Sequence, residues 1–189
     1  IAWAASTRDK LGIPEKAKVF LFAGKLELVK NPELLLSAFT CLTDNESHLV
    51  MVGNGKLEGA LKEKYARYPN IHFLDFQNQT LMPAVYRMAD VFVLGSDSET
   101  WGLAVNEAMA CARAVLVSDR VGCAVDLVLT GRNGSIFKAG DKADLLNKLN
   151  ELRSNPKAKL TEMGKASAEI IKNWNYTVIC NAILDKLRD

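Results

Sequence analysis

DVFVLGSDSETWGLAVNEAMA, residues 90–110, is the stretch that decides the fold, because it passes from a buried strand into a helix. Its first seven residues, 90–96, are dense in β-branched and apolar side chains and too short for a helix, so they predict a buried parallel strand. Farther on, Leu103 and Glu107 recur at helical spacing among alanines, which predicts a helix that begins just after Glu99.

The turn between this strand and this helix is a candidate site for an anion. The first turn of a helix has free backbone N–H groups, and Gly102, which precedes Leu103, has no Cβ to hold an anion away. Glu99 and Glu107 lie eight residues apart, which corresponds to about 12 Å of helix axis. This length matches the separation of the two sugars in a nucleotide diphosphate sugar. We therefore expect one carboxylate on each sugar, although a loop acid and a solvated helix face are the alternative.

Short apolar runs alternate with amphipathic stretches along the whole chain. This alternation predicts an α/β fold, a Rossmann-like doubly wound parallel sheet, in a single domain over residues 1–189. Strands are expected at residues 18–23, 48–52, 71–75, 91–95, 114–118 and 135–137. Helices are expected to begin near Asn31, Lys56, Thr80, Trp101, Cys123 and Lys142, and residues 156–189 are expected to form C-terminal helices that pack on the domain.

Ligands of a doubly wound sheet bind beyond the carboxyl ends of its strands, and candidate residues follow the first two strands. Gly24, Lys25 and Lys30 come after the first strand, where two ammonium groups would stabilise a departing diphosphate without a metal. Gly53 and Gly55 come after the second strand, where a glycine loop lets the backbone approach a phosphate or a base. Solvated loop lysines and an ordinary tight turn are the alternatives.

Two other kinds of site compete for these positions. A dinucleotide-binding fingerprint would need a third glycine where Glu58 stands and would follow the first strand, although Asp75 does lie at the distance of a ribose-binding acid. Asp97 and Glu99 form an acid-x-acid pair that would suit a metal-dependent transferase of another fold. No histidine accompanies that pair, so we predict no metal site. Phe76, after the third strand, is expected to line a base pocket or to pack in the core.

Several motifs together resemble one large protein family. FAGKLELVKNPELLLSAF, residues 22–39, resembles the first strand, Gly-Arg-Leu loop and Lys-Gly helix start of the retaining nucleotide-sugar glycosyltransferases, a family that includes glycogen synthase and sucrose synthase. Glu99 and Glu107 match its Glu-x7-Glu signature. LVMVGNGKLEGAL, NIHFLDF, YRMADVFVLGSDSE, EAMACARAVLVSD, VGCAVDLV and GRNGSIF follow in the family's order. The resemblance covers residues 17–189.

The resemblance implies a role for each candidate side chain. Glu107 would hold the ribose hydroxyls, Glu99 would contact the donor sugar, and Lys25 and Lys30 would carry the diphosphate. No covalent nucleophile is expected, because in this family the leaving phosphate helps to deprotonate the acceptor on the same face of the sugar. No cofactor is expected either.

The resemblance also implies a two-domain enzyme, of which this chain is the C-terminal, donor-binding half. The missing N-terminal domain would hold the acceptor, a saccharide or a lipid-linked molecule, and the last helix would cross back toward that domain. Ile1 in place of Met fits a chain with residues before it. The expected function is hexosyl transfer in cell-surface polysaccharide synthesis, and the isolated half is expected to transfer no sugar. A nucleotide-sugar 2-epimerase and a non-catalytic dinucleotide-binding module are the alternatives.

The chain departs from the family pattern at a few positions. Lys25 replaces the usual Arg, which keeps the charge but loses the planar fork that grips phosphate. Other departures are Thr100 and Trp101 where Gly and an aromatic are common, Ala112 and Arg113 where Gly-Pro is common, and Val125 and Asp126 where Pro-Glu is common.

Composition narrows the class of protein. At 189 residues, of which 49% are hydrophobic, the chain suits one well-cored domain. The 24 basic and 22 acidic residues are spread along it, so neither nucleic acid nor a membrane is an expected partner. The four cysteines are widely spaced and form no CxxC, which favours reduced thiols of a cytoplasmic protein over a disulfide or zinc site.

Overall fold

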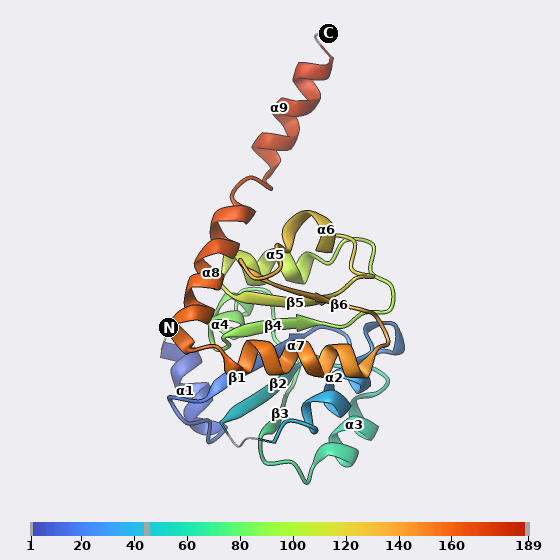
Figure 1. Ribbon diagram of the computed structural model, residues 1–189, viewed down its shortest axis with the longest axis vertical. Coiled ribbons are helices and arrows are strands. Elements are labelled where there is room, and N and C mark those ends of the chain that lie inside the picture. Colours follow the sequence, from blue (N-terminus) through green and yellow to red (C-terminus); the bar gives the residue numbers. More distant parts are fainter. Residues whose placement is uncertain (1, 44–45, 188–189) are drawn as a thin grey trace.

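A parallel sheet of six strands lies at the centre of the computed structural model, which describes residues 2–43 and 46–187 (Figure 1). The strands are β1 (Lys18–Ala23), β2 (Ser47–Val52), β3 (Ile71–Leu74), β4 (Val91–Leu94), β5 (Ala114–Ser118) and β6 (Gly134–Phe137). Their order in the sheet is β3-β2-β1-β4-β5-β6, and each neighbouring pair runs parallel. The order in which successive strands are added to the sheet reverses between β1 and β4, and a doubly wound sheet binds its ligand at such a point. The predicted fold class is confirmed.

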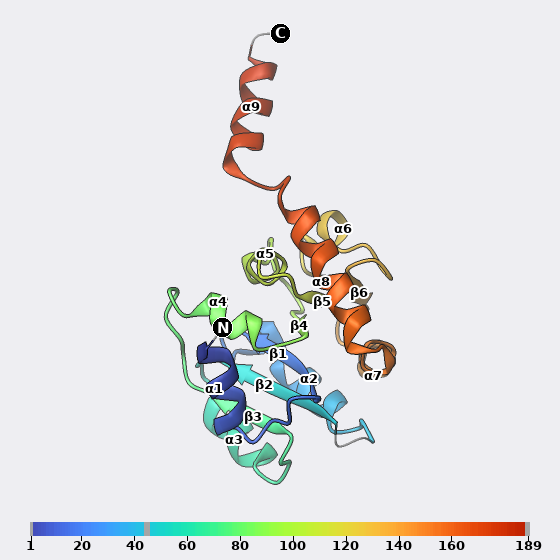
Figure 2. The same ribbon diagram turned by 90° about the vertical axis from the view of Figure 1, so that its left-hand side faces the viewer.

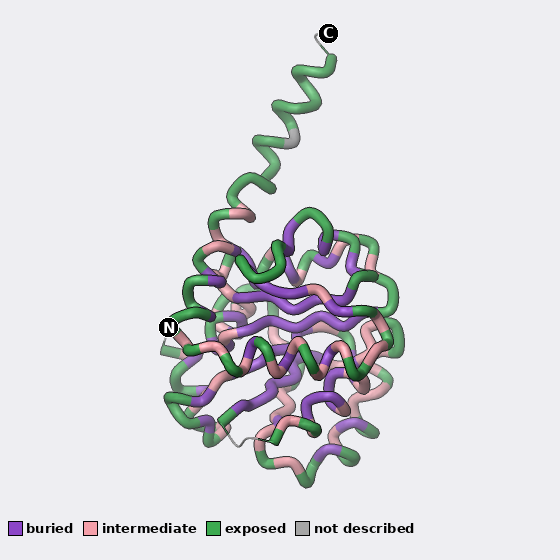
Figure 3. The backbone as a smooth tube through the Cα atoms, in the orientation of Figure 1, coloured by how far each residue is buried: buried purple, intermediate pink, exposed green. Residues whose placement is uncertain are grey.

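Helices cover both faces of the sheet. They are α1 (Ala2–Lys10), the 3₁₀ helix η1 (Leu28–Lys30), α2 (Pro32–Phe39), α3 (Glu58–Tyr65), α4 (Met82–Arg87), α5 (Leu103–Ala110), α6 (Ala124–Leu127), α7 (Lys142–Ser154), α8 (Lys157–Ile171) and α9 (Tyr176–Lys186). Helix α2 packs against α7, whereas α4 contacts both α1 and α5. Figure 2 shows these two groups on opposite sides of the sheet. Strands β1, β2, β4 and β5 are almost completely buried between them (Figure 3).

Helix α1 is an element that the sequence analysis did not predict. It buries only Ala4 and Thr7, so it has no apolar stripe at helical spacing. Its anchor is Arg8, whose guanidinium donates to the carbonyl of Ala17 at 2.8 Å and to that of Met88 at 3.4 Å. A polar side chain therefore fixes this helix against β1 and α4, and hydrophobic periodicity cannot report such an anchor.

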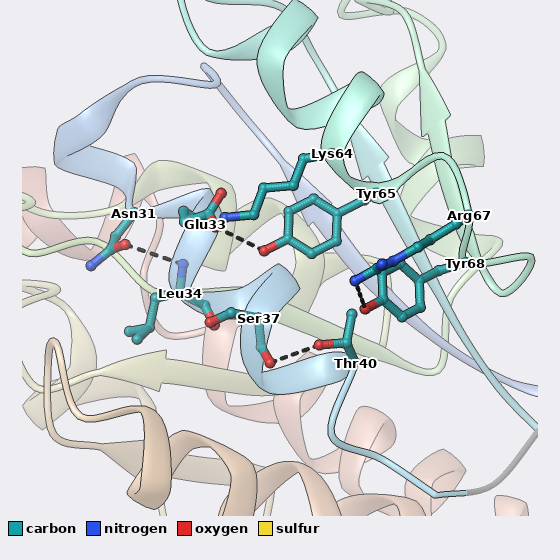
Figure 4. A network of polar contacts seen from close by, with 9 residues as sticks. All are labelled: Asn31, Glu33, Leu34, Ser37, Thr40, Lys64, Tyr65, Arg67 and Tyr68. Carbon is teal, nitrogen blue, oxygen red and sulfur yellow. Dashed lines mark hydrogen bonds and ion pairs between the residues drawn. The ribbon is translucent and has the colours of Figure 1, made fainter.

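A polar network ties α2 to α3 (Figure 4). The Tyr65 hydroxyl donates to Glu33 Oε1 at 2.8 Å, and the Lys64 ammonium donates to the same oxygen at 2.6 Å. Glu33 lies in the first turn of α2, where the helix dipole favours a negative charge. The network thus joins α2 to α3 through hydrogen bonds between their side chains.

The C-terminal helices differ in how they lie. Within residues 156–189, α8 packs on the domain: it buries Leu160 and Met163 and contacts α5 and β5. Helix α9 instead extends away from the sheet (Figures 1 and 2). Its apolar side chains Tyr176, Ile183 and Leu184 are exposed. The described residues thus form one packed body, from which α9 projects.

His48 and His72 lie on neighbouring strands and contact each other. The register pairs Val50 with His72, so His48 lies diagonally across the same face, and its Nδ1 is 2.9 Å from His72 Nε2. Burial, and to a smaller extent the nearby His48, lower the pKa of His72 to about 4. Burial and then Arg8 lower the pKa of His48. Both rings are therefore neutral at pH 7.

This pair makes stability depend on pH. The unfolded chain binds protons near pH 6.5 while the folded chain resists them, so the free energy of unfolding falls as the pH decreases through that value. We expect a loss of about 1 to 2 kcal/mol between pH 7 and pH 5, measured by urea unfolding. The sequence has two histidines, both in this pair, so the replacement His72→Asn should flatten the dependence. An unchanged slope in that variant would refute the assignment.

Candidate functional site

Two adjoining pockets lie at the carboxyl ends of β1, β2 and β4. Pocket A, of about 380 Å³, is bordered by the loops after β1, β2 and β3 and by α5, and its lining includes Gly53, Phe76, Tyr86 and Glu107. Pocket B, of about 440 Å³, is bordered by the loops after β1 and β4 and by the start of α5, and its lining includes Lys30, Glu99, Gly102 and Leu103. Ala23, Gly24, Lys25 and Ala104 line both. The two pockets therefore form one continuous depression with Lys25 at the junction.

Gly53 allows the loops after β1 and β2 to touch. It has a φ of +137°, and a Cβ on it would lie 2.0 Å from the carbonyl oxygen of Gly24. The Gly24 N–H in turn donates to the carbonyl of Val52 at 3.0 Å. The backbone at Gly24 and Gly53 thus forms the floor shared by the ends of β1 and β2.

Gly55 has a different place from the one we expected. It does not line pocket A or pocket B, and a Cβ on it would lie 2.5 Å from the carbonyl oxygen of Leu26. That same carbonyl accepts the N–H of Leu57 at 3.0 Å, and Leu26 N–H donates to the carbonyl of Asn54 at 2.9 Å. The glycine therefore permits close packing of two loops, where we had expected close approach of a ligand.

The two predicted lysines have different surroundings. Lys25 is exposed, and its ammonium donates to Asn54 Oδ1 at 2.9 Å. Lys30 forms an ion pair with Glu99 across pocket B, with side chains that are 25% and 19% exposed. The structure thus brings Lys30 and Glu99 together directly, whereas Lys25 donates to a neutral side-chain amide.

Asn31 is a residue of this region that the sequence analysis did not single out. It adopts a left-handed conformation with a φ of 45° and accepts the N–H of Leu34 as the N-cap of α2. Its side-chain amide also donates to both carboxylate oxygens of Asp97 at 3.0 Å, and Asp97 N–H donates to the carbonyl of Val29. These bonds fasten the loop after β1 to the loop after β4.

Asp97 and Glu99, the acid pair considered for a metal site, both accept hydrogen bonds from neighbouring side chains. The Asp97 carboxylate accepts from Asn31, and the Glu99 carboxylate accepts from Lys30. Within residues 2–43 and 46–187, no group of three His, Cys, Asp or Glu side chains is placed to hold a metal ion. All four cysteines are free thiols, and burial raises the pKa of Cys123 to about 11.

The loop that carries Glu99 is held as a short strand-like segment. Glu99 pairs with Val121 in a parallel bridge, in which Glu99 N–H donates to the carbonyl of Arg120 at 3.1 Å and Gly122 N–H donates to that of Glu99 at 2.9 Å. A Cβ on Gly122 would lie 2.0 Å from the carbonyl oxygen of Thr100. The glycine thus lets the two loops approach closely enough for the bridge to fix the backbone of Glu99.

Helix α5 begins at Leu103, slightly later than we predicted. Glu99 therefore lies before the helix, in the bridge to Val121, and the helical rise that we expected between Glu99 and Glu107 is wrong for the first part of that spacing. Gly102 precedes α5 with a φ of +99°, and a Cβ there would lie 2.8 Å from Val121 Cγ1. The first N–H groups of the helix therefore border pocket B beside Glu99. Trp101, in the same wall, lies against Trp174 with ring centroids 5.2 Å apart. Trp174, in the loop between α8 and α9, thus packs on the wall of pocket B.

Glu107 and Phe76 both lie at pocket A. Glu107 is exposed on α5, and its Oε2 accepts the Tyr86 hydroxyl at 2.8 Å. Phe76 is 62% exposed, so it belongs to the pocket wall and the core alternative is excluded. The sequence analysis missed Tyr86, because only the packing of α4 on α5 brings it to Glu107.

Comparison with known proteins identifies the family. Residues 4–170 match the model described as Glycosyl transferases group 1. The chain belongs to this family. The family predicted from the motifs is thus confirmed, with a match that runs from α1 to the last turn of α8.

Relatives of this group 1 domain include both longer proteins and an isolated domain. The D-inositol 3-phosphate glycosyltransferase 2 of Catenulispora acidiphila is 30% identical over 95% of the chain, which spans 45% of that protein. The structure of Anabaena HepE in complex with UDP-glucose has a TM-score of 0.82 at 21% identity, over 99% of this chain and 52% of that one. A C-terminal domain of the group 1 protein LpcC from Francisella tularensis has a TM-score of 0.76 at 20% identity, over 89% of this chain and 90% of that one.

The chain therefore spans about half the length of these longer relatives. Among the described residues, no helix is long and apolar enough to cross a lipid bilayer. The structure also shows why glycine suits one position at which this chain departs from the family pattern. Ala112, where the family commonly has Gly, adopts a φ of 56°, a conformation that glycine reaches without steric cost.

Proposed function

We propose that this domain is the donor-binding half of a retaining glycosyltransferase, which transfers a hexosyl group from a nucleotide diphosphate sugar to a saccharide or lipid-linked acceptor. The continuity of pockets A and B is the observation that carries the proposal. Glu107 stands in the first pocket, Glu99 stands in the second, and Lys25 borders both. The parts of the donor follow one another in the same order: the nucleoside would lie in pocket A, the diphosphate at the junction and the sugar in pocket B.

Each part of such a donor finds suitable chemistry. The aromatic face of Phe76 suits a base in pocket A, and the Glu107 carboxylate suits ribose hydroxyls. Lys25, Lys30 and the start of α5 supply positive charge for the diphosphate. The Glu99 carboxylate can accept hydrogen bonds from the hydroxyls of the transferred sugar. The bridge to Val121 fixes the backbone of Glu99 and so limits where the carboxylate can lie.

Leaving-group stabilisation is the catalytic contribution that we assign to this half. As the bond between sugar and diphosphate breaks, negative charge grows on the phosphate, and preorganised positive groups stabilise it most strongly at that point. Glu99 is paired with Lys30. This pairing fits a carboxylate that accepts hydrogen bonds from the sugar, and it does not favour a role as covalent nucleophile. Retention then follows if the leaving phosphate accepts the proton of an acceptor that attacks from the same face.

The acceptor side belongs to the missing N-terminal half in this proposal. The longer relatives leave room for such a domain. We further propose a cytoplasmic enzyme of cell-surface polysaccharide synthesis. Catalysis needs both substrates held in a closed site from which water is excluded, so the chain by itself should bind donor and transfer no sugar.

Calorimetry of the purified chain with UDP, GDP and ADP and their glucose and mannose conjugates tests the proposal. One nucleotide series should bind, and Glu107→Ala should weaken that binding about ten- to a hundredfold, because a hydrogen bond to a charged group contributes about 1.5 to 3 kcal/mol. Glu151→Ala, which alters an exposed glutamate on α7, is the matched control. Absence of binding in all series would refute the donor site, and rapid sugar transfer by the chain alone would refute the two-domain assignment.

A further inference from the structure

Glu107 is an exposed side chain on α5 whose carboxylate is nevertheless held in one place. A glutamate on a helix surface samples several rotamers, and ordering it on a ligand reduces the affinity that its hydrogen bonds provide. Here the Tyr86 hydroxyl donates to Glu107 Oε2 at 2.8 Å, so one oxygen is already occupied. The other oxygen, Oε1, keeps its capacity to accept hydrogen bonds.

Tyr86 is itself immobilised by packing. It is 1% exposed, and its ring packs edge to face on Phe92 of β4, with centroids 5.6 Å apart and planes at 74°. Burial raises the pKa of the Tyr86 hydroxyl, and the bond to Glu107 raises it further. The hydroxyl therefore remains a donor throughout the physiological pH range. A buried donor on a fixed ring defines where the exposed carboxylate lies.

We propose that Tyr86 is a positioning residue, which holds Glu107 so that Oε1 meets the ribose hydroxyls of the bound nucleotide. This inference rests on the proposed function, because it assigns the ribose to Glu107. Tyr86 lines pocket A together with Glu107, so the hydrogen bond lies at the wall where the ribose would bind. Its contribution is preorganisation, since the carboxylate is already oriented before the nucleotide arrives.

Tyr86→Phe is the direct test, because it removes the hydroxyl and keeps the ring on Phe92. The probe is whichever of UDP, GDP and ADP binds most tightly, together with its 2′-deoxy form. We expect Tyr86→Phe to weaken binding of the ribonucleotide about five- to tenfold and binding of the 2′-deoxynucleotide less. In the Glu107→Ala background, Tyr86→Phe should have no further effect on affinity.

Tyr65→Phe is a closely matched control. Tyr65 is also buried, and its hydroxyl also donates to a glutamate at 2.8 Å, but that bond to Glu33 lies outside both pockets. Lys64 keeps Glu33 paired when the hydroxyl is removed. Tyr65→Phe should therefore leave nucleotide affinity unchanged, and urea unfolding of both variants reports any common effect on stability.

The outcomes separate this inference from the function on which it rests. If Glu107→Ala weakens binding while Tyr86→Phe does not, the positioning role is wrong and the donor site stands. If Tyr86→Phe weakens binding equally with and without Glu107, it acts through the shape of pocket A, and the inference is overturned. If Glu107→Ala leaves affinity unchanged, the ribose assignment fails, and the positioning role fails with it.

Discussion

Gly53→Ala is expected to abolish measurable nucleotide binding and to lower the free energy of unfolding by about 3 kcal/mol. The new Cβ would lie 2.0 Å from the backbone oxygen of Gly24, and the φ of +137° would strain any residue with a side chain. Both the clash and the strain involve the backbone, so no flexible side chain can move aside to relieve them. The loops after β1 and β2 would have to separate, which displaces Lys25 and opens the junction of pockets A and B.

Urea unfolding and calorimetry with the nucleoside diphosphate measure the two effects. Gly59→Ala is the matched control, because Gly59 lies within α3 in the same segment and a Cβ there would meet nothing within 4 Å. That control should keep its affinity and lose no stability, since alanine favours the helical conformation over glycine. A Gly53→Ala variant that binds nucleotide as tightly as the original chain would show that the contact with Gly24 does not shape the site.

The strands were predictable because a doubly wound sheet buries both of its faces. Each central strand is then an uninterrupted apolar run, which differs from an amphipathic helix in length and in period. Strands β1 and β5 begin and end where the sequence analysis placed them, and the other strands differ by one residue at an end. Helix α1 lacked this signal because Arg8, a polar residue, makes its principal contacts.

Motifs predicted several of the residues that line pockets A and B, but they did not predict how these residues contact one another. Spacing placed Glu99 just before a helix and Glu107 within it, because both lie in a single strand-helix unit. The bond from Asn31 to Asp97 and the bond from Tyr86 to Glu107 join elements that are distant in the chain. Such contacts depend on how loops and helices pack over neighbouring strands, which periodicity within one element does not contain.

Gly55 shows a related limit of predicting a binding site from a sequence motif. Its position in a glycine loop after β2 suggested a backbone that approaches a ligand, as for Gly53. Both glycines have the positive φ that a side chain disfavours, yet one touches Gly24 at the pocket floor and the other touches Leu26 outside the pocket. A glycine motif therefore identifies where backbones come close, and the three-dimensional structure decides which of them faces the ligand.

Lys30→Ala is expected to reduce affinity for the nucleoside diphosphate about a hundredfold or more, and Lys25→Ala about tenfold. The two differ because Lys30 also neutralises Glu99, whereas the hydrogen-bond partner of Lys25 is the neutral Asn54. Removing Lys30 deletes one positive charge and leaves the Glu99 carboxylate unpaired beside the diphosphate, where like charges repel. Replacing Glu99 by Gln in the Lys30→Ala chain should therefore recover much of the lost affinity.

One titration series separates this assignment from a metal-bridged diphosphate. With lysines as the principal ligands, affinity should fall with added salt, because partly exposed charges are screened, and EDTA should have no effect. Lys148→Ala, which breaks an ion pair with Glu151 on α7, is the control for a general loss of positive charge. A divalent ion held by Asp97 and Glu99 would be the largest local charge. Binding would then vanish on chelation while Lys30→Ala had a small effect, and that pair of results would overturn the role of the lysines.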